Sequence, residues 1–454
     1  MAPLAALLAA DGHRVTGSDV RLYPPMSDLL AAAGIVPWEG FDPAHLEPLP
    51  DLVIVGNAVP RQNPEAVACE RLGLRRLSMP EALARFYLAD RRPLVVAGTH
   101  GKTTTTAIAA WVYAACGRDP GYLVGGAPLD LPTSFHRGGG ERFIIEGDEY
   151  NAAYFDRGPK FLHYRPDVAI VTSVEHDHAD LYPTPESFRE AFRKLVRLLP
   201  ESGLLVACGD SDELRTLAAE SAAPVVFYGE RADNDVRFAE SPRGDACGTS
   251  FVVEEAGGAR ASVRLGLWGR HNAANALAVW AAARHDGLEP AAIADAMARF
   301  RGVRRRQELV GEAAGVTVID DFAHHPTAVE TTLAGLRERF PGRRLWVAFE
   351  PRSLTAGRSF LLEGYRAAFR RADGVVLAPI FHRDRLSDGE RLDADALARE
   401  LTDAGVESWA EPSIDAVEAR LLARLAPGDV AVTMSSGAFG GLPRRLVARL
   451  TESA

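Results

Sequence analysis

The chain has 454 residues, of which 51 are Lys or Arg and 61 are Asp or Glu, for a formal net charge of −10. This acidic balance argues against nucleic acid as the main partner. With 47% apolar residues and no apolar run near the roughly 18 residues of a membrane span, the length predicts about three separately packed domains of roughly 150 residues.

Residues 1–90 alternate helix and strand in the order of a Rossmann-like domain. The expected helices cover 5–10 and 26–33, and the expected strands cover 13–17 and 51–57. Asp19 follows the first strand, where such folds contact a ribose, although a turn aspartate explains it equally well. A domain of this type normally opens with a strand and a Gly-rich turn, so a first helix directly after Met1 predicts that either the fold lacks its first strand or the chain is shortened.

Residues 91–302 form a second block that opens on the strongest motif of the chain. A predicted strand and a predicted helix flank this motif, over 94–97 and 107–116. Between them stands Gly98-Thr99-His100-Gly101-Lys102-Thr103-Thr104, a Gly-rich turn that leads into a helix N-terminus and cradles phosphates. Lys102 would reach the β- and γ-phosphates and the Thr103 hydroxyl would hold Mg²⁺. The alternative is an ordinary strand–turn–helix with a surface lysine.

Two further predicted strands of this block end in metal-binding side chains. Residues 142–145 run into the acids of 146–150, of which we favour Glu146 as an Mg²⁺ ligand over an acidic surface loop. Residues 168–173 run into a cluster that contains His178, a candidate for a second Mg²⁺ or for the transferring phosphate. Zinc is the alternative metal for this second cluster. The four cysteines form no Cys-x-x-Cys pair, so we expect no zinc site of that type.

The rest of the second block contains one further candidate site. Residues 230–262 predict an antiparallel insert of short strands. The helix expected over 272–285 begins with Asn272 and Asn275, which share one face because they are three residues apart. Their amides match the donor and acceptor edge of adenine, although Asn is also a common helix N-cap.

Residues 303–454 form a third α/β block. Its expected strands cover 316–319, 345–349, 374–377 and 429–434. The arginines of 304–306 predict a hinge. Asp321 and Phe322 follow the first strand and could hold a ribose and stack on a base, with a salt bridge and a helix start as the alternatives. Arg352 follows the next strand, where a guanidinium can grip a carboxylate, unless this arginine is structural.

Taken together, these stretches resemble the Mur ligase family, the ATP-dependent amide-bond ligases of peptidoglycan assembly. The resemblance covers essentially the whole chain, and the loop from Gly98 to Thr103 has that family's form. It implies an α/β protein of three domains: a Rossmann-like UDP-sugar-binding domain that lacks its first strand, a central P-loop ATPase-type domain that binds ATP, and a Rossmann-like domain for the amino substrate. The implied boundaries are 1–90, 91–302 and 303–454.

The resemblance also implies roles by position. Lys102, Glu146 and His178 would be catalytic, and Thr103, Glu146 and His178 would hold Mg²⁺. The implied ATP contacts are Gly98, Thr99, His100, Gly101, Lys102, Thr103, Thr104, Asn272, Asn275, Arg306, Asp321, Phe322 and His324. The implied substrate contacts are Ser18, Asp19, Asn57 and Arg352. The base for the amine is left open between His178 and His324.

Within the family, four stretches favour the members that join UDP-N-acetylmuramate to the murein tripeptide L-alanyl-γ-D-glutamyl-meso-diaminopimelate in peptidoglycan recycling, through an acyl phosphate. These are 146–150, 160–166, 320–326 and 350–353. Members that add L-alanine would carry Tyr in place of Phe322 and a His-Arg-Tyr motif near Arg352. The alternatives are such an L-alanine ligase, a non-catalytic nucleotide-binding protein and a simple NTPase. We expect a cytoplasmic monomer that uses ATP and Mg²⁺, acts on small molecules and has no nucleic acid or membrane partner.

Overall fold

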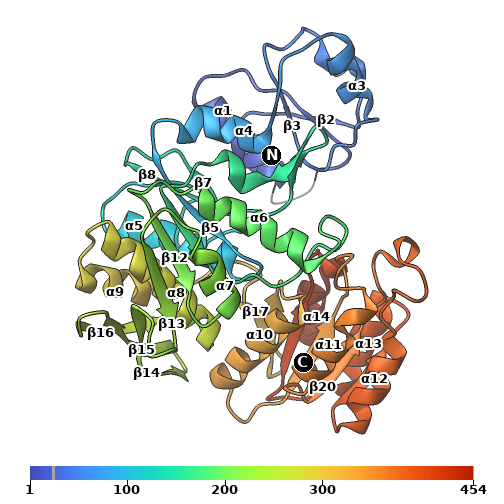
Figure 1. Ribbon diagram of the computed structural model, residues 1–454. Coiled ribbons are helices and arrows are strands. Elements are labelled where there is room, and N and C mark those ends of the chain that lie inside the picture. The colour runs from blue at the N-terminus through green and yellow to red at the C-terminus, as the bar shows by residue number, and fades with distance from the viewer. Residues whose placement is uncertain (23–25, 453–454) are drawn as a thin grey trace.

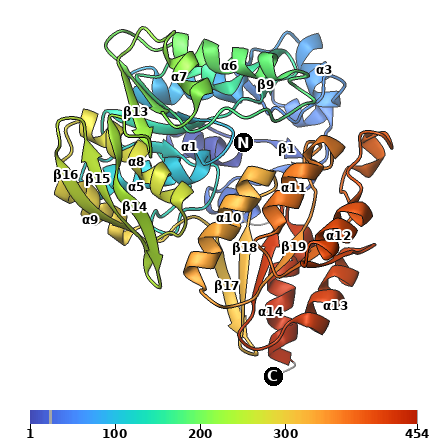
Figure 2. The same ribbon diagram turned by 60° about the horizontal axis from the view of Figure 1, so that its bottom comes forward.

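The computed structural model describes residues 1–22 and 26–452. Three α/β units follow one another along the chain, coloured from blue through green and yellow to red in Figure 1. The N-terminal unit lies at one end of the central unit, and the C-terminal unit lies beside the central unit in the views of both Figure 1 and Figure 2. The mixed α/β class with mainly parallel sheets is confirmed.

The central unit is built on one sheet that contains ten strands in the described chain. In spatial order they are β16 (Arg260–Leu265), β15 (Gly248–Glu255), β14 (Val236–Asp245), β13 (Val225–Gly229), β12 (Leu204–Cys208), β11 (Val168–Val171), β5 (Arg92–Ala97), β8 (Arg142–Gly147), β6 (Gly121–Leu123) and β7 (Phe135–His136). The strands from β14 to β6 are parallel, so the carboxyl ends of β5, β8 and β11 meet at one edge. The insert expected over 230–262 is confirmed as the antiparallel strands β14 to β16 at the border of this sheet.

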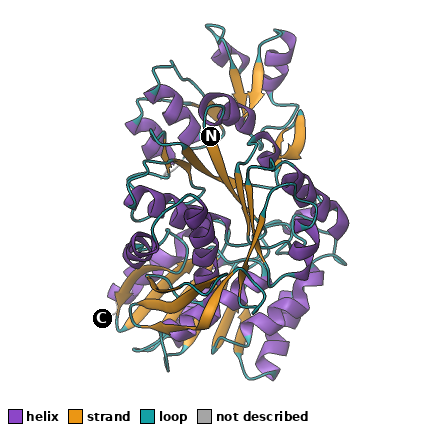
Figure 3. Cartoon of the chain, turned by 60° about the vertical axis from the view of Figure 1, so that its left-hand side comes forward, coloured by secondary structure: helices purple, strands orange, loops and turns teal. Residues whose placement is uncertain are grey.

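Helices cover both faces of the central sheet, as Figure 3 shows. They are α5 (Lys102–Ala115), α8 (Arg270–His285) and α9 (Pro290–Arg299) on one face, and α6 (Pro185–Arg197) and α7 (Asp212–Ala218) on the other. Successive side chains of a strand point to opposite faces, so Leu94 and Val96 pack with the first group while Val95 and Ala97 pack with the second. Burial on both faces explains why these strands are apolar throughout.

The C-terminal unit has a second sheet of six strands within the described residues. They are, in spatial order, β17 (Glu308–Ala313), β18 (Val316–Asp321), β22 (Val430–Met434), β19 (Leu345–Phe349), β20 (Gly374–Leu377) and β21 (Glu407–Ala410). All but the antiparallel edge strand β17 are parallel. Its helices are α10 (Pro326–Arg339), α11 (Leu362–Phe369) and α12 (Ala394–Asp403) on one face, and α13 (Ile414–Arg424) and α14 (Leu442–Glu452) on the other.

The N-terminal unit contains two separate parallel pairs of strands rather than one continuous sheet. They are β1 (Ser18–Asp19) with β2 (Trp38–Glu39), and β3 (Val53–Val55) with β4 (Arg76–Ser78). Its helices are α1 (Ala2–Ala10), α2 (Met26–Ala32), α3 (Pro64–Arg71) and α4 (Met79–Leu83). The strand expected over 13–17 is wrong, because pairing is limited to the two residues of β1. Leu4, Leu7 and Leu8 of α1 instead pack into the core of the central unit, which anchors this unit.

No helix of the described chain is both long enough and apolar enough to cross a bilayer.

Candidate active site

The Gly-rich turn between β5 and α5 has the conformation that a phosphate cradle needs. Gly98 has a φ of +135°, and a Cβ at this position would lie 2.1 Å from the Thr172 hydroxyl oxygen. Gly101 has a φ of +80° and caps α5, and its missing Cβ leaves room for the side chain of Asn275. Both positions therefore require glycine for φ and for close approach. The first backbone amides of α5 are left open toward a bound anion, as at other helix N-termini.

Lys102 is the first residue of α5 and is held inside the site by anionic and carbonyl oxygens. Its Nζ donates to the Gly98 carbonyl and lies 3.0 Å from Glu149 Oε2. Burial alone would lower the pKa of Lys102, but the carboxylates of Glu149 and Asp148 outweigh it and the pKa is raised. The ammonium is therefore charged and close to the loop that it would serve.

Glu149 joins Lys102 to the second cluster of the sequence. This side chain comes two residues after β8, is 1% exposed, and its Oε1 lies 2.9 Å from His178 Nε2. Burial would lower the pKa of His178, but the contacts with Glu149 and Asp177 raise it. His178 has a φ of +53°, a backbone conformation that is uncommon for non-glycine residues and directs this imidazole inward. The sequence analysis included Glu149 in the acidic run of 146–150 but did not predict a role for it.

Glu146 forms a separate carboxylate site beside the loop. Its Oε2 accepts from the Thr103 hydroxyl at 3.0 Å and its Oε1 accepts from the Gly125 amide. Burial and the nearby Asp148 raise the pKa of Glu146 to about 7. Among the described residues, Lys102 pairs with Glu149, His178 pairs with Glu149 and Asp177, and neither pairs with Glu146.

This arrangement fits a divalent cation. A partly buried carboxylate that accepts from a hydroxyl and an amide and makes no ion pair can take a cation, and Mg²⁺ prefers such oxygen ligands. Thr103 and Glu146 could hold one ion, whereas His178, like Lys102, pairs with Glu149. Thr103 of α5, Glu146 of β8 and His178 of the loop after β11 thus lie at the same end of the sheet, but only Thr103 and Glu146 are in contact.

The remaining loop residues are fixed by neighbouring segments. The Thr99 hydroxyl donates to the Glu175 carbonyl and the His100 amide donates to the Ser173 hydroxyl, both from the loop after β11. Thr104 is buried in the first turn of α5. Asn275 faces Gly101 from the second turn of α8, whereas the side-chain amide of Asn272 donates to the Trp268 carbonyl before the helix. The structure therefore brings Asn275 to the loop and uses Asn272 to close the start of α8.

Arg306 connects the C-terminal unit to this site. Its guanidinium lies 3.4 Å from the Thr103 hydroxyl and 4.5 Å from the centre of the Phe322 ring. His324 packs edge-on against Phe322, and burial lowers the pKa of His324. Asp321 is buried with both oxygens bound by backbone amides, from Gln307 and Ala323. Asp321 thus fixes the turn that carries Arg306 and Phe322.

Arg352 lies at the end of β19, on the C-terminal sheet. Its guanidinium is 3.8 Å from the Phe381 ring centre and 3.5 Å from a Glu350 carboxylate oxygen. A Cβ at Gly437 would overlap this guanidinium, so glycine is required there for steric reasons. Arg305 donates to the carbonyl of the same Gly437, which connects the Arg352 region to the arginines at the start of this unit.

The three residues predicted to contact substrate in the N-terminal unit lie apart from the loop. Ser18 contacts His45 at 3.2 Å, Asp19 accepts from the Val20 amide, and Asn57 is exposed after β3. In the described ranges, no hydrogen bond or ion pair joins them to the phosphate loop.

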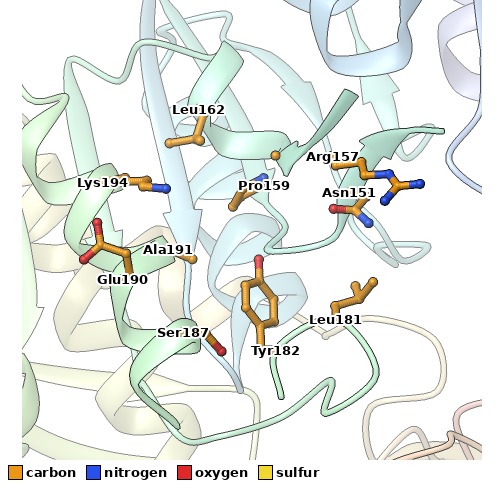
Figure 4. A pocket seen from close by; sticks show the side chains of 11 residues that line it. Asn151, Arg157, Pro159, Leu162, Leu181, Tyr182, Ser187, Glu190, Ala191 and Lys194 are labelled. Atoms are coloured by element: carbon orange, nitrogen blue, oxygen red, sulfur yellow. The ribbon is translucent and has the colours of Figure 1, made fainter. Parts of the chain in front are cut away.

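A small cavity of about 190 Å³ adjoins the site, between α6 and the hairpin of β9 (Asn151–Ala153) and β10 (Asp156–Pro159), as Figure 4 shows. Lys194 and Glu190 line it from α6. Tyr182 also lines it, and its hydroxyl donates to the backbone carbonyl of Glu149. The volume is below the roughly 300 Å³ of typical ligand pockets, so this cavity does not hold a nucleotide.

Comparison with known proteins identifies the family. Three family models match consecutive parts of the chain: Mur ligase family, catalytic domain, over 1–91; Mur ligase middle domain, over 96–283; and Mur ligase, glutamate ligase domain, over 305–437. A UDP-N-acetylmuramate–L-alanyl-gamma-D-glutamyl-meso-2,6-diaminoheptandioate ligase of Escherichia coli K12 is 38% identical over 100% of this chain and 96% of that protein. The chain belongs to the Mur ligase family.

Two further comparisons show which ligases of the family this chain is similar to. A UDP-N-acetylmuramate–L-alanine ligase of Kineococcus radiotolerans is also 38% identical, over 96% of this chain and 91% of that protein. Among solved structures, a murein peptide ligase from Psychrobacter arcticus matches with a TM-score of 0.74 and 34% identity, over 99% of this chain and 96% of that chain. The family resemblance expected from the sequence is therefore confirmed over the full length.

Proposed function

We propose that this Mur ligase joins UDP-N-acetylmuramate to L-alanyl-γ-D-glutamyl-meso-diaminopimelate, with conversion of ATP to ADP and phosphate. The observation that carries the proposal is the meeting of Lys102, Thr103, Glu146 and His178 at one sheet edge, in a chain that matches a ligase of this name over its whole length. The role of the first unit is then to hold the UDP-sugar through Ser18, Asp19 and Asn57. The other two units hold ATP and the peptide.

The first step needs charge neutralisation and alignment rather than a covalent role for the protein. The substrate carboxylate attacks the γ-phosphorus, the bond to ADP breaks, and an acyl phosphate forms. Lys102 and the amides at the start of α5 would bind the γ-phosphate, and Arg306 would approach it from the C-terminal unit. Mg²⁺ held by Thr103 and Glu146, with a second Mg²⁺ at His178, would neutralise the remaining phosphate charge.

The second step needs a base. The peptide amine attacks the acyl carbon, phosphate leaves, and one proton leaves the nitrogen. His324 suits this role, because burial lowers its pKa and its Nδ1 donates to the Phe322 carbonyl, which leaves Nε2 as an acceptor. His178 suits it less, since its Nε2 is bound to Glu149 and its pKa is raised. Arg352 would bind a carboxylate of the peptide.

An assay of ADP release by the 454-residue chain tests this proposal. With Mg²⁺-ATP and UDP-N-acetylmuramate, release should require the tripeptide, and the product should have the mass of the UDP-muramoyl-tripeptide. Release supported by L-alanine instead would assign the activity of the Kineococcus relative. Release without any amine would indicate an NTPase, and ATP binding with no release under any condition would indicate a nucleotide-binding protein.

A further inference from the structure

Three side chains from separate segments meet beside the phosphate loop in an arrangement that the proposed reaction does not use. His100 belongs to the phosphate loop, Glu175 follows β11, and His325 directly precedes α10 of the C-terminal unit. Their ligand atoms all lie within 4.8 Å of one another. Glu175 Oε2 is 3.2 Å from His100 Nε2 and 3.8 Å from His325 Nδ1.

We propose that His100, Glu175 and His325 form a binding site for Zn²⁺ that bridges the central and C-terminal units. Two imidazoles and one carboxylate, with a fourth position left for water, are a typical zinc ligand set. Zinc bonds of about 2.0–2.1 Å in a tetrahedron put neighbouring ligand atoms roughly 3.3 Å apart. The two distances to Glu175 bracket this value and the two imidazole nitrogens lie within 4.8 Å of each other, so side-chain rotations would complete the site.

An unpartnered buried atom points to a missing ligand here. His325 Nδ1 is inaccessible to solvent and has no hydrogen-bond partner in the described chain, although a buried ring nitrogen normally has one. It is the same atom that faces Glu175 Oε2. A cation between these atoms would supply the interaction that this nitrogen lacks.

The charge state of the cluster suits a cation. Burial and the nearby His100 lower the pKa of His325 to about 4, so this imidazole is neutral at physiological pH and offers a lone pair. Burial would raise the pKa of Glu175, but the hydrogen bonds from His100 and Thr327 lower it to about 2, so the carboxylate is ionised.

Thr327 provides the outer support that metal-bound carboxylates usually have. Its hydroxyl donates to Glu175 Oε2 at 2.8 Å, from the first turn of α10. This bond orients the carboxylate toward the two imidazoles and ties it to the C-terminal unit. A zinc ion would therefore connect the phosphate loop to α10 through His325 and through Thr327.

A second cluster in the N-terminal half of the chain provides the control. Glu81, Asp156 and His163 also place ligand atoms within 4.8 Å of one another. Their atoms already have partners, because Asp156 accepts from Ser78 and pairs with His163, and Glu81 caps α4. This cluster lacks the unsatisfied atom, so we expect it to bind zinc weakly.

The test is a count of Zn²⁺ bound by the metal-free 454-residue chain, by competition with a chromogenic chelator and with no nucleotide present. The wild type should hold one Zn²⁺ that His325→Gln weakens by at least about 100-fold, more than loss of an outer partner costs. His324→Gln, which changes the adjacent histidine, and His163→Gln, in the second cluster, should leave this site within about threefold. Thr327→Val should weaken it by roughly 10-fold.

The folding of each variant is checked separately, so a variant that does not fold is not counted for or against the zinc site. Glu175→Gln should reproduce the loss, and Zn²⁺ should raise the melting temperature of the wild type but not of His325→Gln or Glu175→Gln. Folded His325→Gln and Glu175→Gln chains that bind Zn²⁺ like the wild type would overturn the proposal. So would a wild type that binds no Zn²⁺ at micromolar concentrations, or a site that is lost only in His163→Gln. This readout involves no turnover and is independent of the proposed ligase activity.

Discussion

The carboxyl ends of the strands form one edge of the central sheet and one edge of the C-terminal sheet, and the pKa values of titratable groups at these two edges are shifted by different causes. At the central edge, Lys102 has a raised pKa and Glu149 a lowered one, because each is paired and the charged forms stabilise one another. At the C-terminal edge, burial raises the pKa of Asp320 to about 6 and lowers the pKa of His324. Pairing dominates over desolvation for Lys102 and Glu149 at the first edge, whereas desolvation dominates for Glu146 beside them and for both groups at the second edge. Under the proposed function, the first edge would meet phosphate and metal charge, and the second would accept a proton.

Removal of the lysine charge from the first edge should have the largest effect. Lys102→Met should lower kcat for ADP release by about 10³-fold, because one preorganised cation at the transferring phosphate is lost. Steady-state kinetics at saturating ATP measures this. Lys194→Met, in α6, is the matched control and should stay within about twofold; equal losses in both variants would contradict a specific role for Lys102.

The steric requirement of the loop can be separated from its φ requirement. Gly98→Ala should lower the free energy of unfolding by about 3 kcal/mol, because its Cβ would overlap Thr172 as well as strain the backbone. Gly258→Ala is the control, since Gly258 has a φ of +87° and nothing within 4 Å of an added Cβ. It should cost only about 1 kcal/mol in urea unfolding. Equal costs would show that the close approach at Gly98 is unimportant.

Glu149 tests whether the charges of the first edge depend on pairing. Glu149→Gln should lower kcat by about 10²-fold, since the cations Lys102 and His178 lose the carboxylate between them. The pKa of His178, followed by NMR, should fall in this variant because its partner no longer carries charge. An unchanged His178 pKa would contradict the pairing account.

Arg352 tests the peptide side of the second edge. Arg352→Lys should raise KM for the tripeptide by about 30-fold and leave KM for ATP within about twofold, because a planar two-bond contact with a carboxylate is lost. Arg420→Lys, an arginine that pairs with Glu411 on the same unit, is the control and should change neither constant. A rise in KM for ATP alone would move Arg352 out of the peptide site.

Asp320 tests the neutral character of the second edge and has the smallest expected effect. Its folded pKa of about 6 lies above the ordinary value of 3.8, so its contribution to stability is present below pH 4 and is lost as pH rises through 6. Asp320→Asn should therefore be more stable than the wild type by about 1–2 kcal/mol at pH 7.5 and equal to it near pH 4. Urea unfolding at both values measures this, with the exposed Asp388→Asn as control. A variant that is less stable than the wild type at pH 7.5 would contradict this prediction.

The sequence predicted the apolar parallel strands and the loop between β5 and α5, because both depend on local pattern. It placed the start of α5 too late, since the β-branched run from Thr103 to Thr106 lowers helix propensity, while burial of these residues stabilises the helix. It also missed β17, a polar edge strand that has no apolar alternation. Glu149 was not selected because its partners come from β5 and β11, which become neighbours only when the sheet forms out of chain order.

The central claim, that the phosphate loop transfers the γ-phosphate to a substrate carboxylate, is tested most directly by isotope transfer. UDP-N-acetylmuramate labelled with ¹⁸O in its lactyl carboxylate is turned over with ATP and the tripeptide, and the released phosphate is analysed by mass. The account predicts one ¹⁸O in each phosphate, because the carboxylate oxygen attacks phosphorus and leaves with it. Unlabelled phosphate from a reaction that still forms the amide would contradict it.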